Sequence, residues 1–462
     1  MLRLQPELAW IGGRFRTGVV LEVENGSITR VALDGATADS ANVVRLPGRA
    51  LMPGMVNAHS HAFQRLIRGH TQWKPAGNPR ADFWSWREAM YASLAQLTPE
   101  DVYAVSRFAF TEMLLAGYTS VGEFHYLQRD VDGSAYGDAN ELAHAVIRAA
   151  RDVGIRMALL NVCYAQGGIG QPLQPQQRRF ATPDLDAFMA ATGQLAEAVS
   201  QDAMISVGVA PHSVRAVRRD WLPPLAQLAR QLDAPLHMHL SEQPAEVASS
   251  VEQYGLRPVE VAAEEGLLSQ RFTAIHATHV TEQEIRLFAE SGSTVCVCPS
   301  TERDLGDGIA QADRFQHAGV PLAIGTDSQT VIDPWEELRC LEYHTRLVRL
   351  ERVVLSEAQD EKLQVATPLL RVGTADGAAA LRLRTGELAV GQAADFITID
   401  LDHYALAGWT VESLPAMLAL SGSAYFVRDV WVGGERVVAD RAHDGLGESY
   451  EAFVSVAEKV FG

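Results

Sequence analysis

The stretch that decides the fold is Ala50-Leu51-Met52-Pro53-Gly54-Met55-Val56, an apolar run that leads into His59-Ser60-His61. Alternate residues of a strand point to the same side, so the two imidazoles converge while Ser60 faces away. A strand presents two nitrogen ligands to one divalent metal in this way. Because histidine pairs with this spacing also occur at surfaces and in satisfied cores, the metal interpretation depends on the rest of the chain.

Seven further apolar runs of strand length follow, and helical stretches separate them. With the run before His59 they make eight β-α units, which predict an α/β fold: a TIM-like (β/α)8 barrel whose chemistry lies at the C-terminal ends of its strands. The seven runs are Thr119–Gly122, Arg156–Leu160, Ile205–Val209, Leu236–His239, Thr273–His276, Thr294–Val297 and Leu322–Gly325.

Both ends of the chain carry short strand-like pieces outside this barrel. Between residues 8 and 50 they are separated by Gly and Asn-Gly turns, and a matching set returns at Asp395–Ile399 and Val427–Val432. Neither set could bury a core alone, so we expect the two ends to form one β-sandwich. The expected domains are a composite β-sandwich from 1–50 and 385–445, a metal-dependent barrel from 51–384 and a C-terminal helix from 446–462.

Composition narrows the class of protein. The 462 residues carry a net charge of −18 with no run of five or more Lys or Arg, which argues against a nucleic-acid partner. No apolar stretch is long enough to span a membrane and the N-terminus lacks the pattern of a signal peptide, so a cytoplasmic enzyme without a membrane partner is expected. The four cysteines form no C-x-x-C pair and are interpreted as reduced core residues.

Potential metal ligands lie at the ends of four of the eight predicted strands. Because several imidazoles and a carboxylate that converge without a metal would be costly to desolvate, the set indicates a metal centre. On the sixth strand His276 is preferred to His279, since His279 falls in the loop. The candidates are, in chain order, His59, His61, His237, His239, His276 and Asp327.

This pattern resembles the amidohydrolase superfamily, which has His-x-His on strand one, His on strands five and six, and Asp on strand eight. The resemblance covers nearly the whole chain, including the split sandwich. In the deaminases of that superfamily the ligand on strand five is followed three residues later by a glutamate. His239 and Glu242 match that spacing, and His237 then lies one layer deeper. The resemblance thus implies a metal held by His59, His61, His239 and Asp327.

One branch of the superfamily bridges two metals through a carbamylated lysine on strand four. The only lysines in this chain are Lys74, Lys362 and Lys459, and none lies on a predicted barrel strand. One divalent metal is therefore expected. Zinc suits a nitrogen-rich site best, while iron and manganese stay open.

Together these groups predict hydrolytic deamination. Water on a divalent cation loses a proton near neutral pH, and Asp327 would accept that proton. Glu242 would carry a proton to the substrate nitrogen, and His276 would hydrogen-bond the attacking oxygen. This arrangement suits attack on a carbon doubly bonded to nitrogen, with loss of ammonia. The site differs from the cytidine-deaminase type, because the chain has no H-x-E with P-C-x-x-C.

Residues expected at the same rim indicate an anionic substrate. Two arginines with Gln, Tyr and His partners suggest a carboxylate clamp, because a guanidinium binds a carboxylate through two parallel hydrogen bonds. Residues 62–98 are suited to covering a pocket, and whether they move as a lid is left open. The rim residues are Gln64 and Arg65 after strand one, Trp84–Arg87 in the long loop, His125–Tyr126 after strand two and His212–Arg215 after strand four.

Five stretches are similar to the formiminoglutamate deiminase family of histidine degradation: Asn57–Arg65, Asp82–Arg87, Glu123–Tyr126, His237–Gln243 and Cys298–Gly308. That family converts N-formimino-L-glutamate to N-formyl-L-glutamate and ammonia. The resemblance implies a small dicarboxylate substrate and a homodimer, and it leaves the roles of Arg65 and Arg303 open. It also implies that the two carboxylates of the substrate are bound by Gln64, Arg87, Tyr126, His212 and Arg215.

Other functions fit parts of the pattern. A deaminase or chlorohydrolase acting on a purine, pterin or triazine ring would share the metal and catalytic residues, but it would stack a ring and would need no pair of arginines. Hydrolysis of imidazolonepropionate is chemically close but opens a ring rather than releasing ammonia. A noncatalytic scaffold derived from the barrel would usually have lost ligands, whereas every ligand position in this chain is filled.

Overall fold

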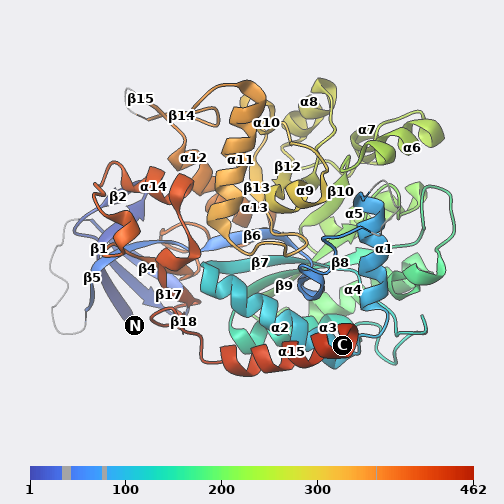
Figure 1. Cartoon of the computed structure of the whole chain (residues 1–462), viewed down its shortest axis with the longest axis horizontal. Helices are drawn as coiled ribbons and strands as arrows, with labels where there is room; N and C mark the ends of the chain where they lie inside the picture. Colours follow the sequence, from blue (N-terminus) through green and yellow to red (C-terminus); the bar gives the residue numbers. More distant parts are fainter. Residues whose placement is uncertain (34–42, 75–80, 360–361) are drawn as a thin grey trace.

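A computed structural model describes residues 1–33, 43–74, 81–359 and 362–462. It contains an eight-stranded parallel barrel and, beside it, a mixed sheet built from both ends of the chain (Figure 1). The predicted fold class, a TIM-like barrel with a β-sandwich from the two chain ends, is confirmed. Among the described helices, none is long and apolar enough to cross a membrane.

The barrel strands follow one another in chain order, and each is hydrogen-bonded in parallel to the next. Nearly all their residues are buried on both faces, which explains why the sequence shows continuous apolar runs rather than alternation. The strands are β6 (Met55–Ser60), β7 (Tyr118–His125), β8 (Arg156–Cys163), β9 (Ile205–Pro211), β10 (Leu236–Leu240), β11 (Phe272–His276), β12 (Thr294–Val297) and β13 (Leu322–Ile324).

The barrel closes where the segment after β13 meets the end of β6. Ser60 and Asp327 form a parallel bridge there. The Asp327 N–H donates to the His59 carbonyl and the His61 N–H donates to the Asp327 carbonyl, each at 3.0 Å. A Cβ on Gly325 would lie 2.7 Å from the Cβ and the carbonyl oxygen of His59, so only glycine lets the two segments approach this closely. Closure therefore joins the first and last ligand-bearing segments directly.

The sequence led us to expect one barrel strand at Ala50–Val56, but the structure divides this run between two strands. Its first part belongs to β5 (Val44–Pro53), which pairs with β1 (Leu2–Ile11) in parallel and with β16 (Phe396–Asp400) in antiparallel fashion. Gly54 separates β5 from β6, and a Cβ there would clash with Thr119 at 2.0 Å. β5 thus links the two chain ends and leads into the barrel.

The outer sheet has the order β18-β17-β16-β5-β1-β3-β4, with β2 paired to β1. It buries a core of its own, to which the N-terminal strands contribute Leu4 and Leu21 and the C-terminal strands Phe396 and Trp431. The remaining strands are β2 (Arg14–Arg16), β3 (Val20–Glu24), β4 (Ser27–Ala32), β17 (Val427–Val432), β18 (Glu435–Val438) and the separate hairpin of β14 (Glu357–Gln359) and β15 (Lys362–Gln364).

Helices surround the barrel, and many have strong end signals. α2, for example, begins at a capping box between Thr98 and Asp101 and ends at Gly117, whose φ is 99°. The α-helices are α1 (Phe83–Leu94), α2 (Pro99–Ala116), α3 (Glu141–Val153), α4 (Leu185–Ala198), α5 (Leu222–Gln231), α6 (Pro244–Tyr254), α7 (Pro258–Glu264), α8 (Glu282–Ser291), α9 (Pro299–Leu305), α10 (Ala312–His317), α11 (Pro334–Arg349), α12 (Ala366–Arg371), α13 (Gly377–Ala380), α14 (Leu414–Ser421) and α15 (Leu446–Phe461).

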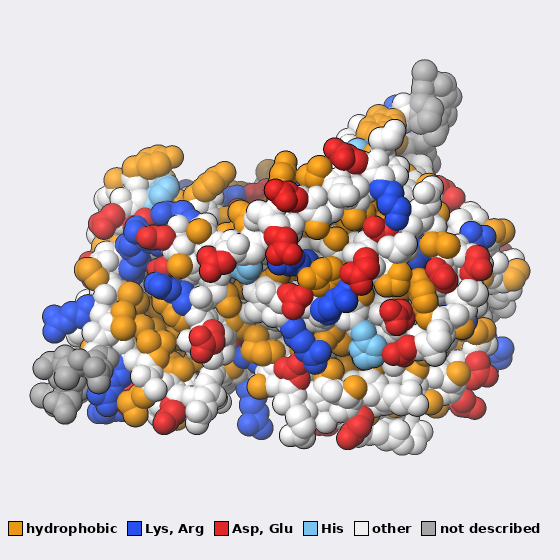
Figure 2. All heavy atoms as spheres, turned by 90° about the horizontal axis from the view of Figure 1, so that it is seen from below, with side chains coloured by type: hydrophobic (Ala, Val, Ile, Leu, Met, Phe, Trp, Pro, Cys, Tyr) orange, Lys and Arg blue, Asp and Glu red, His pale blue; other side chains and the backbone are white. Residues whose placement is uncertain are grey.

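The C-terminal helix α15 packs on α2, where the rings of Phe108 and Phe453 stack with centroids 4.6 Å apart. On the face seen from below in Figure 2, acidic and basic side chains are interspersed with apolar ones. Ion pairs such as Arg107–Glu448 at 2.8 Å join the two helices. This face therefore carries no extended region of a single charge sign.

Candidate active site

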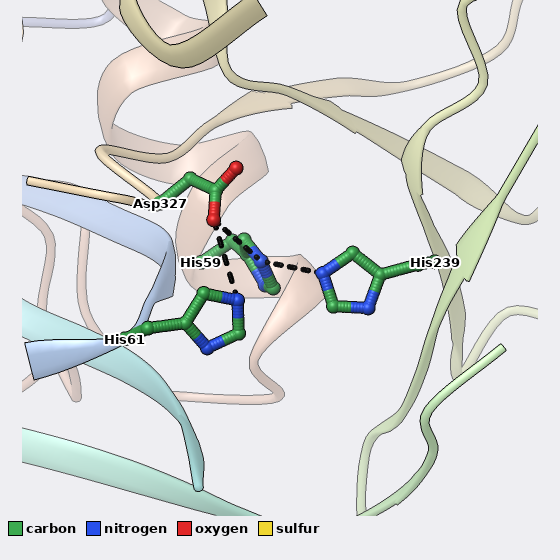
Figure 3. Close-up of side chains that lie close together, drawn as sticks. All are labelled: His59, His61, His239 and Asp327. Carbon is green, nitrogen blue, oxygen red and sulfur yellow. Dashed lines mark hydrogen bonds and ion pairs between the residues drawn. The ribbon is translucent and has the colours of Figure 1, made fainter. Parts of the chain in front are cut away.

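Three imidazoles and one carboxylate meet at the C-terminal mouth of the barrel. His59, His61, His239 and Asp327 each offer a ligand atom, and these atoms lie within 4.8 Å of one another (Figure 3). The Nε2 atoms of His59 and His239 are 3.1 Å apart. Asp327 Oδ1 lies 3.5 Å from His59 Nε2 and 3.3 Å from His61 Nε2. All four side chains are buried, and we call them the floor cluster.

Backbone carbonyls orient two of the imidazoles. Nδ1 of His61 lies 2.9 Å from the Phe124 carbonyl, and Nδ1 of His239 lies 3.1 Å from the His212 carbonyl. Because a carbonyl only accepts, each Nδ1 carries the proton and each Nε2 presents its lone pair to the cluster. Such contacts to the second ring nitrogen are what fix a histidine as a metal ligand.

The electrostatics of the floor cluster fit a divalent cation. Burial lowers the pKa of His59 to about 3, and it also lowers the pKa values of His61 and His239, so the rings are neutral at ordinary pH. Burial opposes ionisation of Asp327, but the hydrogen bond from His59 and the surrounding imidazoles hold the pKa of Asp327 below its usual value. Three neutral nitrogens and one carboxylate are a donor set that zinc accepts.

Two further predicted residues adjoin the floor cluster. His276 Nε2 lies 3.6 Å from Asp327 Oδ2 and 3.9 Å from Glu242 Oε1. On the other side of the ring, His276 Nδ1 is 3.2 Å from Glu302 Oε1. Burial opposes a charge on His276, but Glu242, Glu302 and Asp327 together raise its pKa well above the ordinary range. The structure thus brings Glu242, His276 and Asp327 together.

Backbone strain accompanies this arrangement. His276 and Asp327 adopt positive φ values of 68° and 46°. A left-handed conformation of a residue other than glycine costs of order 1–3 kcal/mol and persists only where the surrounding structure imposes it. His276 is the last residue of β11 and Asp327 lies three residues after β13, so the strain occurs where the chain turns at the mouth of the barrel.

Glu242 is held from its other side by Arg215. Arg215 Nη2 lies 3.2 Å from Glu242 Oε2, and Arg215 Nε lies 3.5 Å from Glu246 Oε2. Burial raises the pKa of Glu242, although His276 and Arg215 oppose that rise. A raised pKa suits a carboxyl group that must hold a proton near neutral pH.

All five residues expected to bind the substrate line one pocket above the floor cluster. The space between its lining atoms amounts to about 490 Å³, part of which is open to solvent. In its wall Gln64 donates a hydrogen bond to the Tyr126 hydroxyl at 2.9 Å. Helix α1 contributes several of the lining residues, which are His61, Gln64, Phe83, Trp86, Arg87, Met90, Tyr91, Tyr126, Tyr164, His212, Arg215, His239, Glu242, His276, Leu305 and Asp327.

Arg87 enters this pocket from α1 between aromatic rings. Its guanidinium carbon lies 4.6 Å from the ring centre of Trp84 and 5.6 Å from that of Tyr91. Its Nε is buried and has no hydrogen-bond partner among the described residues. Aromatic faces therefore hold this cation in place without neutralising it, unlike Arg215.

Two arginines whose roles the sequence left open lie outside the pocket. Arg65 is paired with Glu112 and lies 4.9 Å from the ring centre of Phe453. Arg303 pairs with Glu336 at 3.0 Å. Neither is among the residues that line the pocket. Whether residues 62–98 move as a lid was left open, and this segment includes residues 75–80, which lie outside the described residues.

The sequence analysis missed several residues of the site. Glu302 lies in a stretch we had singled out, but nothing in the sequence connects it with His276. Glu246 lies near the start of α6, and its Oε2 accepts a hydrogen bond from the backbone N–H of Glu242 at 3.3 Å; helical spacing could not have revealed this, because Glu242 precedes the helix. Packing alone brings Tyr91 and Tyr164 into the lining of the pocket. His237 lies deeper, where its Nε2 is 2.9 Å from the Ala380 carbonyl.

Comparison with known proteins places the chain among amidohydrolases. A model of the amidohydrolase family matches residues 50–437. The formimidoylglutamate deiminase of Pseudomonas aeruginosa is 40% identical over 99% of both chains. The crystal structure of an amidohydrolase from Brucella melitensis is 32% identical, covers 100% of both chains and has a TM-score of 0.90. An adenosine deaminase from Xanthomonas campestris with bound zinc is 28% identical over 99% of this chain and 98% of that one, with a TM-score of 0.83.

These relatives include a deiminase and a deaminase, which supports hydrolytic deamination as the class of reaction. The family model begins in β5 and ends in β18, so the matched segment contains the whole barrel and every residue of the floor cluster. On this match and on the identity with its relatives, the chain belongs to the amidohydrolase family.

Proposed function

We propose that this protein hydrolyses N-formimino-L-glutamate to N-formyl-L-glutamate and ammonia, a reaction of histidine degradation. The observation that carries the proposal is that two buried or half-buried arginines, Arg87 and Arg215, line the same pocket as the floor cluster. A pocket of this kind can hold carboxylates at one end and react with a C=N group at the other. The deiminase of Pseudomonas aeruginosa at 40% identity supports the same substrate.

The substrate would lie with its carboxylates against the arginines. The buried Nε of Arg87 has no hydrogen-bond partner among the described residues. It can therefore donate to a carboxylate without giving up an existing hydrogen bond. Gln64, Tyr126 and His212 complete the expected set of donors in the same wall. This placement leaves the formimino carbon close to Asp327 and Glu242 at the floor.

The floor cluster would hold one divalent ion, and we propose zinc. His59, His61, His239 and Asp327 would be its ligands. Bound there, such an ion would polarise the C=N group and lower the pKa of the attacking water. The residues of the chain supply the rest of the chemistry.

Three side chains would move the protons. Asp327 would accept the proton of the attacking water, and its Oδ2 is 3.6 Å from His276, which would hydrogen-bond the attacking oxygen. Glu242 would protonate the nitrogen that leaves as ammonia, since burial favours its protonated form. Arg215, 3.2 Å from Glu242, would hold that carboxyl group in position.

Ammonia release tests this proposal directly. The purified zinc-loaded protein would be assayed with N-formimino-L-glutamate beside guanine, adenosine and a triazine. We expect release from N-formimino-L-glutamate alone. N-formimino-glycine, which lacks the side-chain carboxylate, is a matched control and should react far more slowly. Equal rates with both formimino compounds would contradict a clamp for two carboxylates.

Deamination of a purine, pterin or triazine ring is the second candidate. Aromatic side chains favour it, because Phe83, Trp86 and Tyr91 line the pocket and could stack on a ring. The zinc-containing adenosine deaminase among the structural relatives also points this way. Release from a ring substrate alone in the same assay would select this function and remove the arginine assignments.

We also propose that the protein is a cytoplasmic homodimer with a small-molecule substrate. Analytical ultracentrifugation would give the oligomeric state, and a single monomeric species at working concentration would contradict the dimer.

A further inference from the structure

A second set of potential metal ligands lies beside the floor cluster. His276, Cys298 and Asp327 each offer one ligand atom, and these atoms lie within 4.8 Å of one another. All three side chains are buried. We propose that this set is a second, inhibitory cation site, which binds Zn²⁺ or Cd²⁺ when either ion is in excess over the first site.

Asp327 can serve both sites because its two oxygens face different partners. Oδ1 lies 3.5 Å from His59 Nε2 and 3.3 Å from His61 Nε2. Oδ2 instead lies 3.6 Å from His276 Nε2. One oxygen is therefore directed to the first ion and the other to the second, and ions about 3.5–4 Å apart are usual in two-metal sites.

His276 presents a nitrogen that the described protein leaves unsatisfied. Its Nδ1 is held by Glu302 Oε1 at 3.2 Å. Its Nε2 is buried and has no hydrogen-bond partner within the described part of the chain. The carboxylates of Glu242, Glu302 and Asp327 surround the ring, so the local field favours a cation at this place. A divalent ion on Nε2 would displace the proton that the ring otherwise carries there, release it to solvent, and be attracted by the same carboxylates.

Cys298 gives the site its selectivity. It follows β12 directly, and its backbone N–H donates to Glu302 Oε1 at 2.9 Å. A metal deprotonates a coordinating thiol, and the thiolate prefers zinc and its heavier relatives to Mg²⁺, Ca²⁺ or Mn²⁺. Zinc bonds of about 2.0–2.3 Å place tetrahedral ligand atoms roughly 3.5 Å apart, so binding needs side-chain movements of about 1 Å.

Occupation of this site would stop turnover. The ion would occupy the imidazole of His276 and one oxygen of Asp327, and the proposed reaction uses both groups. The first ion would stay bound, since His59, His61 and His239 are not disturbed. Because binding at the second site requires no substrate, it can be tested whether or not the proposed substrate is correct.

A cadmium titration tests the proposal. Protein that contains one zinc per chain would be titrated with Cd²⁺, and the thiolate-to-cadmium absorption and the metal content would be measured. We expect wild-type protein to bind a second equivalent with this absorption. In Cys298→Ser the absorption should vanish and the second equivalent should bind at least about tenfold more weakly, because a hydroxyl is a poor ligand for cadmium.

Two cysteine variants are matched controls. Cys163→Ser changes a buried thiol at the end of β8, and Cys340→Ser changes the thiol near Arg303. Both should bind the second equivalent as wild-type protein does. Retention of the absorption in Cys298→Ser, or its loss in a control variant alone, would overturn the assignment.

Crystals of the wild-type protein soaked in cadmium give a result that needs no substitution. We expect an anomalous peak within bonding distance of Cys298 Sγ and Asp327 Oδ2, in addition to the ion at the floor cluster. A single peak among His59, His61 and His239 would overturn the proposal, even if Cys298→Ser failed to fold.

Discussion

The floor and the roof of the pocket are built in different ways. The floor cluster comes from the ends of buried parallel strands, and backbone carbonyls fix the rings of His61 and His239. The roof is the part of α1 that lines the pocket, where Arg87 is held by the faces of Trp84 and Tyr91. Backbone pairing thus positions the groups expected to react, whereas side-chain packing positions the groups expected to recognise the substrate. The two regions should therefore fail differently when they are altered.

Asp327→Asn should give the largest effect. The substitution keeps the shape but removes the proton acceptor, so kcat should fall by roughly 10⁴-fold, the upper range for such groups. Steady-state ammonia release measures this. Asp313→Asn removes a carboxylate on α10 that pairs with Arg349 of α11; it is the matched control and should turn over normally. Full activity in Asp327→Asn would show that Asp327 is not the proton acceptor at the floor of the pocket.

Glu242→Gln should give the next largest effect on kcat. The amide cannot deliver a proton, so kcat should fall by about 10²–10³-fold while one metal ion per chain is retained. Metal analysis by atomic emission and single-turnover kinetics would be measured on the same preparation. Loss of the metal in this variant would show that Glu242 is a ligand rather than a proton carrier.

Arg87→Met should mainly affect substrate binding. Loss of a charged hydrogen bond worth about 1.5–3 kcal/mol should raise KM by roughly 10- to 150-fold with a smaller change in kcat. Arg215→Met should change kcat as well, because Arg215 also contacts Glu242. Arg148→Met is a matched control, since Arg148 stacks on Tyr103 at 4.2 Å on the outside of the barrel. If Arg87→Met and Arg215→Met changed KM and kcat in the same way, the proposed difference between roof and floor would be wrong.

Glu337→Gln should leave activity unchanged and alter stability alone. Burial raises the pKa of Glu337 from 4.5 to about 8. Between these values the unfolded carboxyl group is ionised and the folded one is protonated, so the free energy of unfolding falls as the pH rises through this window. The glutamine variant lacks this contribution and should show a shallower decline. Urea denaturation at about pH 5 and about pH 8 measures the change in the free energy of unfolding. An equal change in the wild type and the variant would contradict a raised pKa of Glu337.

The floor could be predicted from the sequence because strand geometry fixes it. The alternation rule placed His59 and His61 together, and each barrel strand was recognisable from its apolar run. The same rule failed at Ala50–Val56, since a continuous run does not show that Gly54 divides it between two sheets. A local apolar pattern indicates that a strand is present, but it does not show where one strand ends and the next begins or to which sheet each belongs.

The surroundings of the floor could not be predicted, because they depend on contacts between distant segments. Glu302 reaches His276 from the next β-α unit, and Arg65 turns away from the pocket to Glu112. Both outcomes are decided by packing rather than by spacing. A rim arginine and a structural arginine therefore look alike in the sequence, as Arg87 and Arg65 do.

The bridge between Ser60 and Asp327 can form only after the last barrel strand has been synthesised, so the four ligands of the floor cluster come together late. A growing chain presents the three imidazoles of the floor cluster well before Asp327 leaves the ribosome. Only when the segment after β13 docks against β6 do all four ligands exist in one place. A metal bound by the floor cluster would therefore meet its complete ligand set only after this docking.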